Sequence, residues 1–419
     1  DRSSAASDVY KRQYLMCLIK NTNSTCMKKL FSEINGYLCG ISEKSPQGNE
    51  LKRINSLSGL ITGIIRKGKS DLPSIGSGLP REINANSKTV AAKRFIENKW
   101  VDYESHYLPF LTKFLPAIIA FTPYDKTLEL VIDGSQMGKN NAALMISIVW
   151  QNRGIPICWF VKKGSKGHFK EEEHVQVLQE AYNVLSPILP EKMPVVLLGD
   201  GEFDGIELQK FCLSSSWDYV LRTACNTVLF ENGDRFKARD IEPTDHQHCT
   251  FIQDVEFTNE RFKSVNFLCW HHTQRHEEPI FLISNLTEAG DIMHFYDKRY
   301  AIECLFKDMK TASFNLHKTR LKKPDEVATL ILIAALAFIL IISLGMQFNE
   351  LKWRKKVQRV RCRRKVLSFF SFSYLLIQYL LENDICFKFS LHISKNYADF
   401  FPGYTLSLIH ISEPTRPLD

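Results

Sequence analysis

The sequence lacks the cysteine patterns of a disulfide-bonded or zinc-binding scaffold. Its eleven cysteines are scattered along 419 residues, and no two of them form a Cys-x-x-Cys pair. An odd and dispersed set of thiols is not typical of a disulfide framework and fits a reducing compartment. We therefore expect a cytoplasmic protein.

The N-terminus also lacks a secretory signal. The apolar run at 16–19 is too short for one, and no cleavage pattern follows it. The chain does not begin with Met, and residues 1–13 and 407–419 resemble translated adapter tails of sequencing reads. We expect both ends to be artefacts that take no part in the fold.

The composition lacks the bias of a disordered chain. Hydrophobic residues make up 44% and charged residues 24%, which is typical of globular proteins. The length suffices for two or three domains. A net charge of +8 favours a polyanionic partner only weakly, because many basic proteins bind no polyanion.

Residues 14–120 predict a helical region with a basic surface. Apolar positions at helical spacing alternate with lysines and arginines up to residue 70. A stretch rich in Gly, Ser, Pro and Asn follows at 72–88 and is typical of a hinge. Ser87 can cap the helix that comes next. Such a region either binds DNA or caps the neighbouring domain without a ligand.

The pattern changes near residue 126 from helices to strands. Seven elements follow in the order β-β-β-α-β-α-β, at residues 128–133, 142–150, 155–161, 170–185, 194–199, 206–213 and 218–222. The first three are joined by short turns and predict an antiparallel meander. The whole order predicts an RNase H-like α/β core, in which a mixed sheet is flanked by helices.

A β-rich insertion interrupts the predicted α/β core, and the core resumes after it. Turn-rich alternating segments predict a β-rich insertion, and a helix resumes near Ile292. We divide the chain after the helical region into a first core part, the insertion, a second core part and a basic helical C-terminal region, at 126–223, 224–290, 291–350 and 351–406.

Two strands of the expected core end on an acid. Asp133 closes the run 128–133, and Asp200 follows the run 194–199. A short, rigid carboxylate at the rim of a buried sheet can hold a hard divalent cation such as Mg²⁺. Asp after a strand is also a common turn former, so each acid alone leaves both interpretations open.

The helix after residue 292 carries a polar stripe. At about 100° per residue, Tyr296, Arg299, Glu303 and Lys310 share a stripe about 60° wide and about 21 Å long. The adjoining face is apolar and consists of Phe295, Ile302, Leu305, Phe306 and Met309. One face would pack on the core while the stripe runs along its edge; ordinary surface charges are the alternative.

These motifs together resemble one family. The spacing Y-x2-R-x3-E-x6-K resembles the signature of insertion-sequence transposases with a DDE catalytic triad, of the family-four type. IDGSQMG and LLGDGEFDG resemble the segments that hold that family's first and second catalytic Asp, matching Asp133 and Asp200. Glu303 matches the third acid. The resemblance covers roughly residues 87–345, and the β-rich insertion before Glu303 fits it; Asp204 competes with Asp200 for the second position.

The resemblance implies a metal-dependent enzyme that cuts DNA at transposon ends and joins the freed 3′-hydroxyl to a target, a cut-and-paste reaction that can pass through a hairpin. Asp133, Asp200 and Glu303 would hold two Mg²⁺ or Mn²⁺ ions. Tyr296, Arg299 and Lys310 would bind phosphates near the scissile bond. The implied partners are double-stranded DNA with terminal inverted repeats, target DNA and a second copy of the chain when DNA is bound. The implied location is the bacterial nucleoid.

Three further stretches lie outside this catalytic scheme. Residues 327–345 carry no charge and are long enough to span a membrane. Because they directly follow the catalytic helix, we expect a buried helix behind the sheet and no membrane. The run 351–365 holds nine Lys or Arg and either grips DNA backbone or forms a solvated helix. The apolar run 368–383 should pack on another element.

The insertion contains possible metal and base contacts. Its histidines and one cysteine lack the two closely spaced ligand pairs of a typical zinc site. We therefore expect them to be ordinary loop and strand residues and not zinc ligands: His246, His248, Cys249, His271, His272 and His276. Trp270 beside them either stacks on an unpaired base or packs the insertion.

Three rival functions remain at the level of sequence. An RNase H-fold nuclease would cut DNA without joining it. A catalytically silent DNA-binding descendant would keep the fold, although its acids should then have been lost. A membrane protein would use residues 327–345 as its span.

Overall fold

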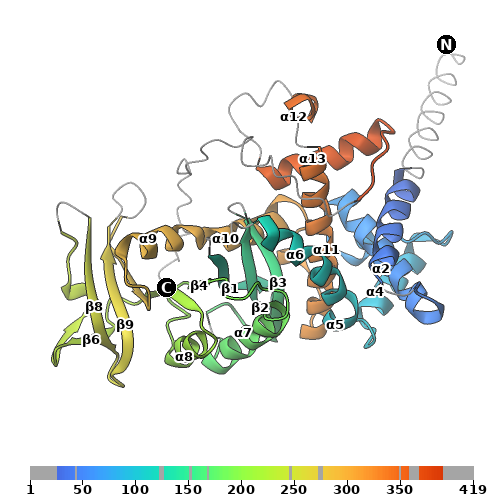
Figure 1. Cartoon of the computed structure of the whole chain (residues 1–419). Coiled ribbons are helices and arrows are strands. Elements are labelled where there is room, and N and C mark those ends of the chain that lie inside the picture. The colour runs from blue at the N-terminus through green and yellow to red at the C-terminus, as the bar shows by residue number, and fades with distance from the viewer. Residues whose placement is uncertain are drawn as a thin grey trace, which may run out of the picture.

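One mixed sheet with helices on both sides organises the molecule (Figure 1). The computed structural model describes residues 26–42, 45–121, 127–150, 153–167, 169–244, 248–271, 277–348, 351–357 and 368–389. Both adapter-like ends lie outside these residues.

The first five strands form the expected core. They are β1 (Leu128–Met137), β2 (Asn141–Trp150), β3 (Arg153–Lys163), β4 (Val195–Gly199) and β5 (Asp218–Thr223). Their spatial order is β3-β2-β1-β4-β5, with β1, β2 and β3 antiparallel and β4 and β5 parallel to β1. The predicted α/β fold with an RNase H-like mixed sheet is confirmed.

Two helices connect the parallel strands. α7 (Glu171–Leu185) leads from β3 to β4, and α8 (Ile206–Ser214) leads from β4 to β5. α7 packs on β2 and β3 and contacts α8. The opposite side of the sheet carries the later helices (Figure 1). Parallel neighbours require such crossovers, which bury both faces of β1 and β4.

The insertion is rich in strands, as its alternation predicts. It contains β6 (Val228–Glu231), β7 (Asp234–Lys237), β8 (Cys249–Phe257), β9 (Phe262–Trp270) and β10 (Ile280–Ser284), with a 3-10 turn at Ala238–Asp240. β10 pairs with β5, so these strands extend the core sheet to ten strands. The insertion therefore shares its sheet with the core.

The N-terminal region is helical. Residues 26–41 are helical, and five helices follow: α2 (Gly48–Lys67), α3 (Leu72–Gly76), α4 (Ala85–Ile96), α5 (Tyr103–His106) and α6 (Leu108–Phe121). The segment expected to be a hinge contains α3, capped by Asp71. The predicted cap at Ser87 is wrong, because Asn84 caps α4 and its Oδ1 accepts from the Ser87 amide.

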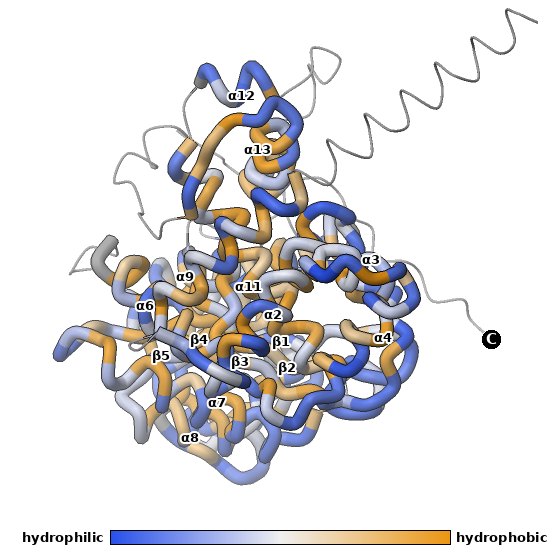
Figure 2. The backbone as a smooth tube through the Cα atoms, turned by 90° about the vertical axis from the view of Figure 1, so that its right-hand side faces the viewer, coloured by the Kyte–Doolittle hydropathy of each residue, from blue (hydrophilic) through white to orange (hydrophobic). Residues whose placement is uncertain are grey.

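The long apolar stretch forms a buried helix, as predicted. α11 (Pro324–Gln347) is long and apolar enough to cross a membrane, yet almost all of it is buried inside the protein. Figure 2 shows its hydrophobic course in the middle of the molecule. The apolar run 368–383 forms α13 (Phe369–Glu382), which packs on α11 as expected. Of the basic run, α12 (Leu351–Val357) is described, and 358–367 lies outside the described residues.

The helix that carries the polar stripe is interrupted. α9 (Ala289–Lys298) ends at Arg299, α10 (Tyr300–Lys307) follows, and a π-helical turn spans Asp308–Ala312. A 3-10 turn at Leu316–Lys318 leads toward α11. Arg299 itself keeps a right-handed helical backbone between the two helices. The predicted stripe assumed a constant 100° per residue, and the π-helical turn that carries Lys310 departs from that spacing.

Candidate active site

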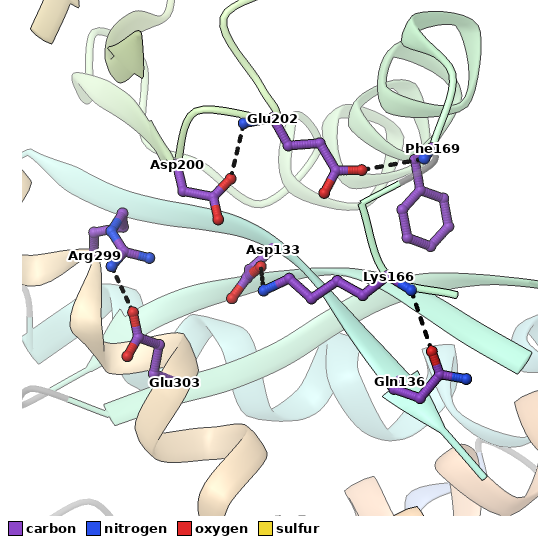
Figure 3. A network of polar contacts seen from close by, with 8 residues as sticks. All are labelled: Asp133, Gln136, Lys166, Phe169, Asp200, Glu202, Arg299 and Glu303. Carbon is purple, nitrogen blue, oxygen red and sulfur yellow. Dashed lines mark hydrogen bonds and ion pairs between the residues drawn. The ribbon is translucent and has the colours of Figure 1, made fainter. Parts of the chain in front are cut away.

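The two predicted aspartates lie on neighbouring parallel strands. β1 and β4 pair with Val131 beside Leu198. Continued by two residues, the same register puts Asp133 beside Asp200, and Figure 3 shows both side chains on one side of the strands. Parallel pairing without a shift is what brings two carboxylates so distant in sequence together.

Asp133 lies within a strand and not at its end. β1 continues past it to Met137, and the Asp133 side chain is 3% exposed. The expectation that β1 closes on Asp133 is therefore wrong, because pairing with β2 extends the strand. Burial raises the pKa of the Asp133 carboxyl, and the nearby Asp200 adds to the rise, while Lys166 opposes it.

Lys166 is the cation that compensates the buried Asp133. Its Nζ lies 2.9 Å from Asp133 Oδ1, and its backbone amide donates to Gln136 Oε1 at 3.2 Å (Figure 3). The Gln136 amide in turn donates to Asn141 O at 2.9 Å, which ties the loop after β3 to the β1–β2 hairpin. The sequence analysis missed Lys166, because only the folded loop brings it to Asp133.

Glu303 faces the aspartates from α10. Its carboxylate pairs with Arg299, and Figure 3 shows the pair opposite Asp133 and Asp200. The Arg299 guanidinium lies 5.7 Å from the centre of the Tyr296 ring. Burial raises the pKa of the Tyr296 hydroxyl, and Arg299 opposes that rise. Three residues of the predicted stripe therefore meet at the break between α9 and α10.

Lys310 reaches the same neighbourhood from the π-helical turn. Burial and the positive charge of Lys166 lower the pKa of Lys310 to about 8, while Asp133 opposes the change. Its Nζ lies 5.6 Å from the centre of the Phe306 ring. All six residues predicted for the site thus lie on the elements that surround Asp133.

Two more acids lie in the loop after β4. Glu202 accepts from the Phe169 amide at 3.1 Å and donates its own amide to Asp200 Oδ1 at 3.0 Å. Burial raises the pKa of Glu202, and Asp200 contributes. Asp204 instead accepts from Thr223 Oγ1 at 2.6 Å. Asp204 is thus held toward β5, while Asp200 faces Asp133. The sequence analysis missed Glu202.

The three acids offer the oxygen ligands that a hard divalent cation prefers. They surround one space between the strands and α10 (Figure 3), and the buried Asp133 already lies against a cationic group. Within the described ranges, no group of three or more His, Cys, Asp or Glu side chains is gathered closely enough to hold an ion. Lys166 and Arg299 pair with two of the three carboxylates, so these cations would compete with a metal ion for the same side chains.

The insertion offers no alternative site among its described residues. His248, Cys249 and His271 are described and belong to no metal-binding group, while His246, His272 and His276 lie outside the described residues. Trp270 is 6% exposed, so it packs the insertion and is not available for base stacking.

Part of the chain matches a known family model. Residues 166–340 match the family model described as a transposase DDE domain. The predicted recognition of a DDE transposase is thus confirmed over this segment, which includes Asp200, Glu303 and the polar stripe but begins after Asp133. No curated protein sequence matches the chain.

Several solved structures align with the chain at low structural similarity. One is the cryo-EM structure of the piggyBac transposase synaptic complex with hairpin DNA, at 12% identity over 86% of this chain and 79% of that chain, with a TM-score of 0.44. Aquifex aeolicus Argonaute is 12% identical over 60% of this chain and 33% of its own, with a TM-score of 0.24. Marinitoga piezophila Argonaute with guide RNA and target DNA is 13% identical over 59% and 34%, with a TM-score of 0.21.

Proposed function

We propose that this chain, whose residues 166–340 match a transposase DDE domain, is a DNA transposase that cuts and joins DNA by cut-and-paste. The observation that supports the proposal most is the register of β1 and β4, which puts Asp133 beside Asp200 with Glu303 facing them. Two aligned acids and a third from a helix form a suitable ligand set for divalent ions.

The three acids would hold Mg²⁺ or Mn²⁺. Two such ions about 3.5–4 Å apart activate an attacking oxygen and stabilise a leaving oxygen in phosphoryl transfer. Arg299 and Lys310 would neutralise phosphate charge beside the scissile bond, and the Tyr296 hydroxyl would donate a hydrogen bond to a phosphate oxygen.

Before metal and DNA bind, Lys166 and Arg299 would neutralise acidic side chains of the site. Each holds one of the acidic side chains, which limits repulsion between carboxylates that would otherwise face each other. On binding, these two cations would turn from the carboxylates to DNA phosphates, so their charge stays within the site.

The proposed partners are the two transposon ends, with their terminal inverted repeats, and a target DNA. Pairing two ends requires two active sites, so we propose a homodimer on DNA in the bacterial cytoplasm. The basic run 351–365 would hold the DNA backbone without reading its sequence.

A strand-transfer assay tests the reaction. The DNA that flanks the coding region is offered to the protein with a circular target and Mg²⁺ or Mn²⁺. We expect flank ends to be cut and covalently joined to the circle. Cut ends without joined products would indicate the nuclease alternative, and uncut DNA in the presence of binding would indicate a silent descendant.

A further inference from the structure

A basic hollow lies in the N-terminal helical region, away from the acids of the sheet. It has a volume of about 380 Å³, and its cationic lining comes from α2, from the loop before α4 and from α4 itself. The four cations are Lys52, Arg53, Arg81 and Arg94, and Trp100 lies among the lining residues after α4. Segments far apart in sequence thus gather positive charge around one concave surface.

The lining of this hollow carries positive side chains and no acidic one. No acidic residue lines it, and in the described parts of the chain none of its four cations forms an ion pair. The buried Nε of Arg53 has no hydrogen-bond partner there. The charged neighbour Asp102, whose pKa Arg53 helps to lower, already accepts from Ser105. Arginines without an ion-pair partner in a concave surface favour an anionic ligand.

Trp100 adds a flat exposed ring to the lining. It is 64% exposed, and its backbone amide donates to Asn98 Oδ1 at 3.1 Å. Lys99 Nζ lies 5.4 Å from the centre of the ring. An exposed aromatic ring beside cations suits the sugars and bases of a nucleic acid.

We propose that this hollow is a binding site for the phosphate backbone of duplex DNA. The inference rests on the proposed function, because a transposase must hold DNA beyond the bond that it cuts. In Figure 1, α2 and α4 lie at the end of the molecule opposite to β8 and β9, with the catalytic strands between them. The arginines would bind phosphate oxygens through paired N–H groups, and Trp100 would lie against the neighbouring sugar.

Charge-removing variants of the full chain test this site by DNA binding. Arg53→Gln and Arg94→Gln are compared with Lys93→Gln, which removes the same charge one residue away, where Lys93 pairs with Glu97 outside the hollow. We expect each arginine variant to weaken binding of a labelled random-sequence duplex about 3- to 10-fold at low salt. Each should reduce the slope of log affinity against log salt by about 0.9, and Trp100→Ala should also weaken binding. Lys93→Gln should bind as the wild type does.

The same measurements show which result would overturn the DNA-binding site and which would overturn the proposed reaction. Equal affinity and equal salt slope for the arginine variants and Lys93→Gln would overturn the inference, provided that the thermal unfolding of all variants matches the wild type. If the wild type joins DNA while the arginine variants bind it normally, only the site is wrong. If the arginine variants lose affinity but the wild type never cuts DNA, the site stands and the proposed reaction is wrong. A further outcome is that inorganic phosphate stabilises the wild type against thermal unfolding while the arginine substitutions leave DNA affinity unchanged. That result would identify a small-anion site and overturn the DNA assignment.

Discussion

Asp133 carries a charge that the fold itself must neutralise. Its side chain is almost completely buried, and Lys166 supplies the opposite charge from a loop that is partly open to solvent. A buried carboxylate without a cation would be costly, so the loop lysine stabilises the protein before any ion binds. The same contact should compete with a divalent ion for Asp133.

Replacing Lys166 should therefore strengthen metal binding by the free protein. We expect Lys166→Met to bind Mn²⁺ about 3- to 10-fold more tightly without DNA, because the ion no longer displaces an ammonium group; partial exposure keeps the effect modest. Electron paramagnetic resonance of free Mn²⁺ measures this directly. Lys163→Met, at the exposed end of β3, is the matched control. Unchanged or weaker Mn²⁺ binding by Lys166→Met would contradict the competition.

The sequence predicted part of the site because part of its pattern is local. Asp200 follows a short apolar strand, and Glu303 lies within a spaced motif. Lys166 and Glu202 carry no such signal, since their positions depend on how the loops after β3 and β4 meet. Nor does the sequence of β1 show that pairing with β2 carries the strand beyond Asp133.

At the scale of elements, α2 and α3 pack so closely at Gly63 that no side chain fits between their backbones. A Cβ atom added to Gly63 would lie 2.1 Å from the Ile75 carbonyl oxygen. Glycine is thus required in α2, where it otherwise lowers helix stability. The sequence analysis assigned α3 to a hinge because Gly, Ser and Pro dominate it, and its close packing on α2 is not visible in that composition.

Gly63→Ala should destabilise the protein despite the better helix propensity of alanine. We expect the free energy of unfolding to fall by about 1–3 kcal/mol, because backbone atoms must move to admit the methyl group. Gly36→Ala is the control, since nothing lies within 4 Å of a Cβ there and the helix should be unchanged or slightly more stable. Urea unfolding measures both. A neutral Gly63→Ala would show that α2 and α3 are not in close contact.

α7 carries a buried histidine that should make the fold sensitive to acid. His174 is 3% exposed, packs 4.8 Å from the Phe203 ring, and neither ring nitrogen has a hydrogen-bond partner in the described structure. Burial lowers its pKa to about 4. The unfolded chain, with an ordinary histidine pKa near 6.5, therefore binds more protons, and stability falls as the pH drops from about 6.5 to 4.

His174→Leu should remove this part of the pH dependence. We expect the difference in unfolding free energy between wild type and variant to shift in favour of the variant by about 1.4 kcal/mol for each pH unit across that window. Urea unfolding at several pH values between 7.5 and 4.5 measures the difference. Parallel curves for the two proteins would mean that His174 is not held neutral by burial.

The helical segment 289–312 shows the limit of what helical periodicity can predict. A constant 100° per residue predicted one stripe, and the apolar residues Ile302, Leu305 and Met309 are indeed buried. The π turn at Lys310 is not visible in that pattern. The π turn and tertiary packing place the polar residues around Asp133, and a helical wheel predicts neither.

For the whole molecule, one ten-stranded sheet joins β1 and β4 to the insertion, and α11 forms the apolar centre of the helical layer. The order and type of the core elements followed from their apolar periods, because each is short and regular. The joining of β10 to β5 did not, since strand pairing over such a distance leaves no local pattern in the sequence. The function assigned to the molecule depends on the alignment of β1 with β4.

Metal-dependent cutting of the flanking DNA by matched acid variants tests that claim most directly. We predict that Asp133→Asn, Asp200→Asn and Glu303→Gln keep the fold and DNA binding but lower cleavage in Mg²⁺ on the order of 1,000-fold or more. Asp204→Asn is the control, since Asp204 bonds Thr223 and faces away from Asp133; it should cut at close to the wild-type rate. Normal cleavage by Asp200→Asn, or its loss only in Asp204→Asn, would contradict the assignment of the catalytic acids.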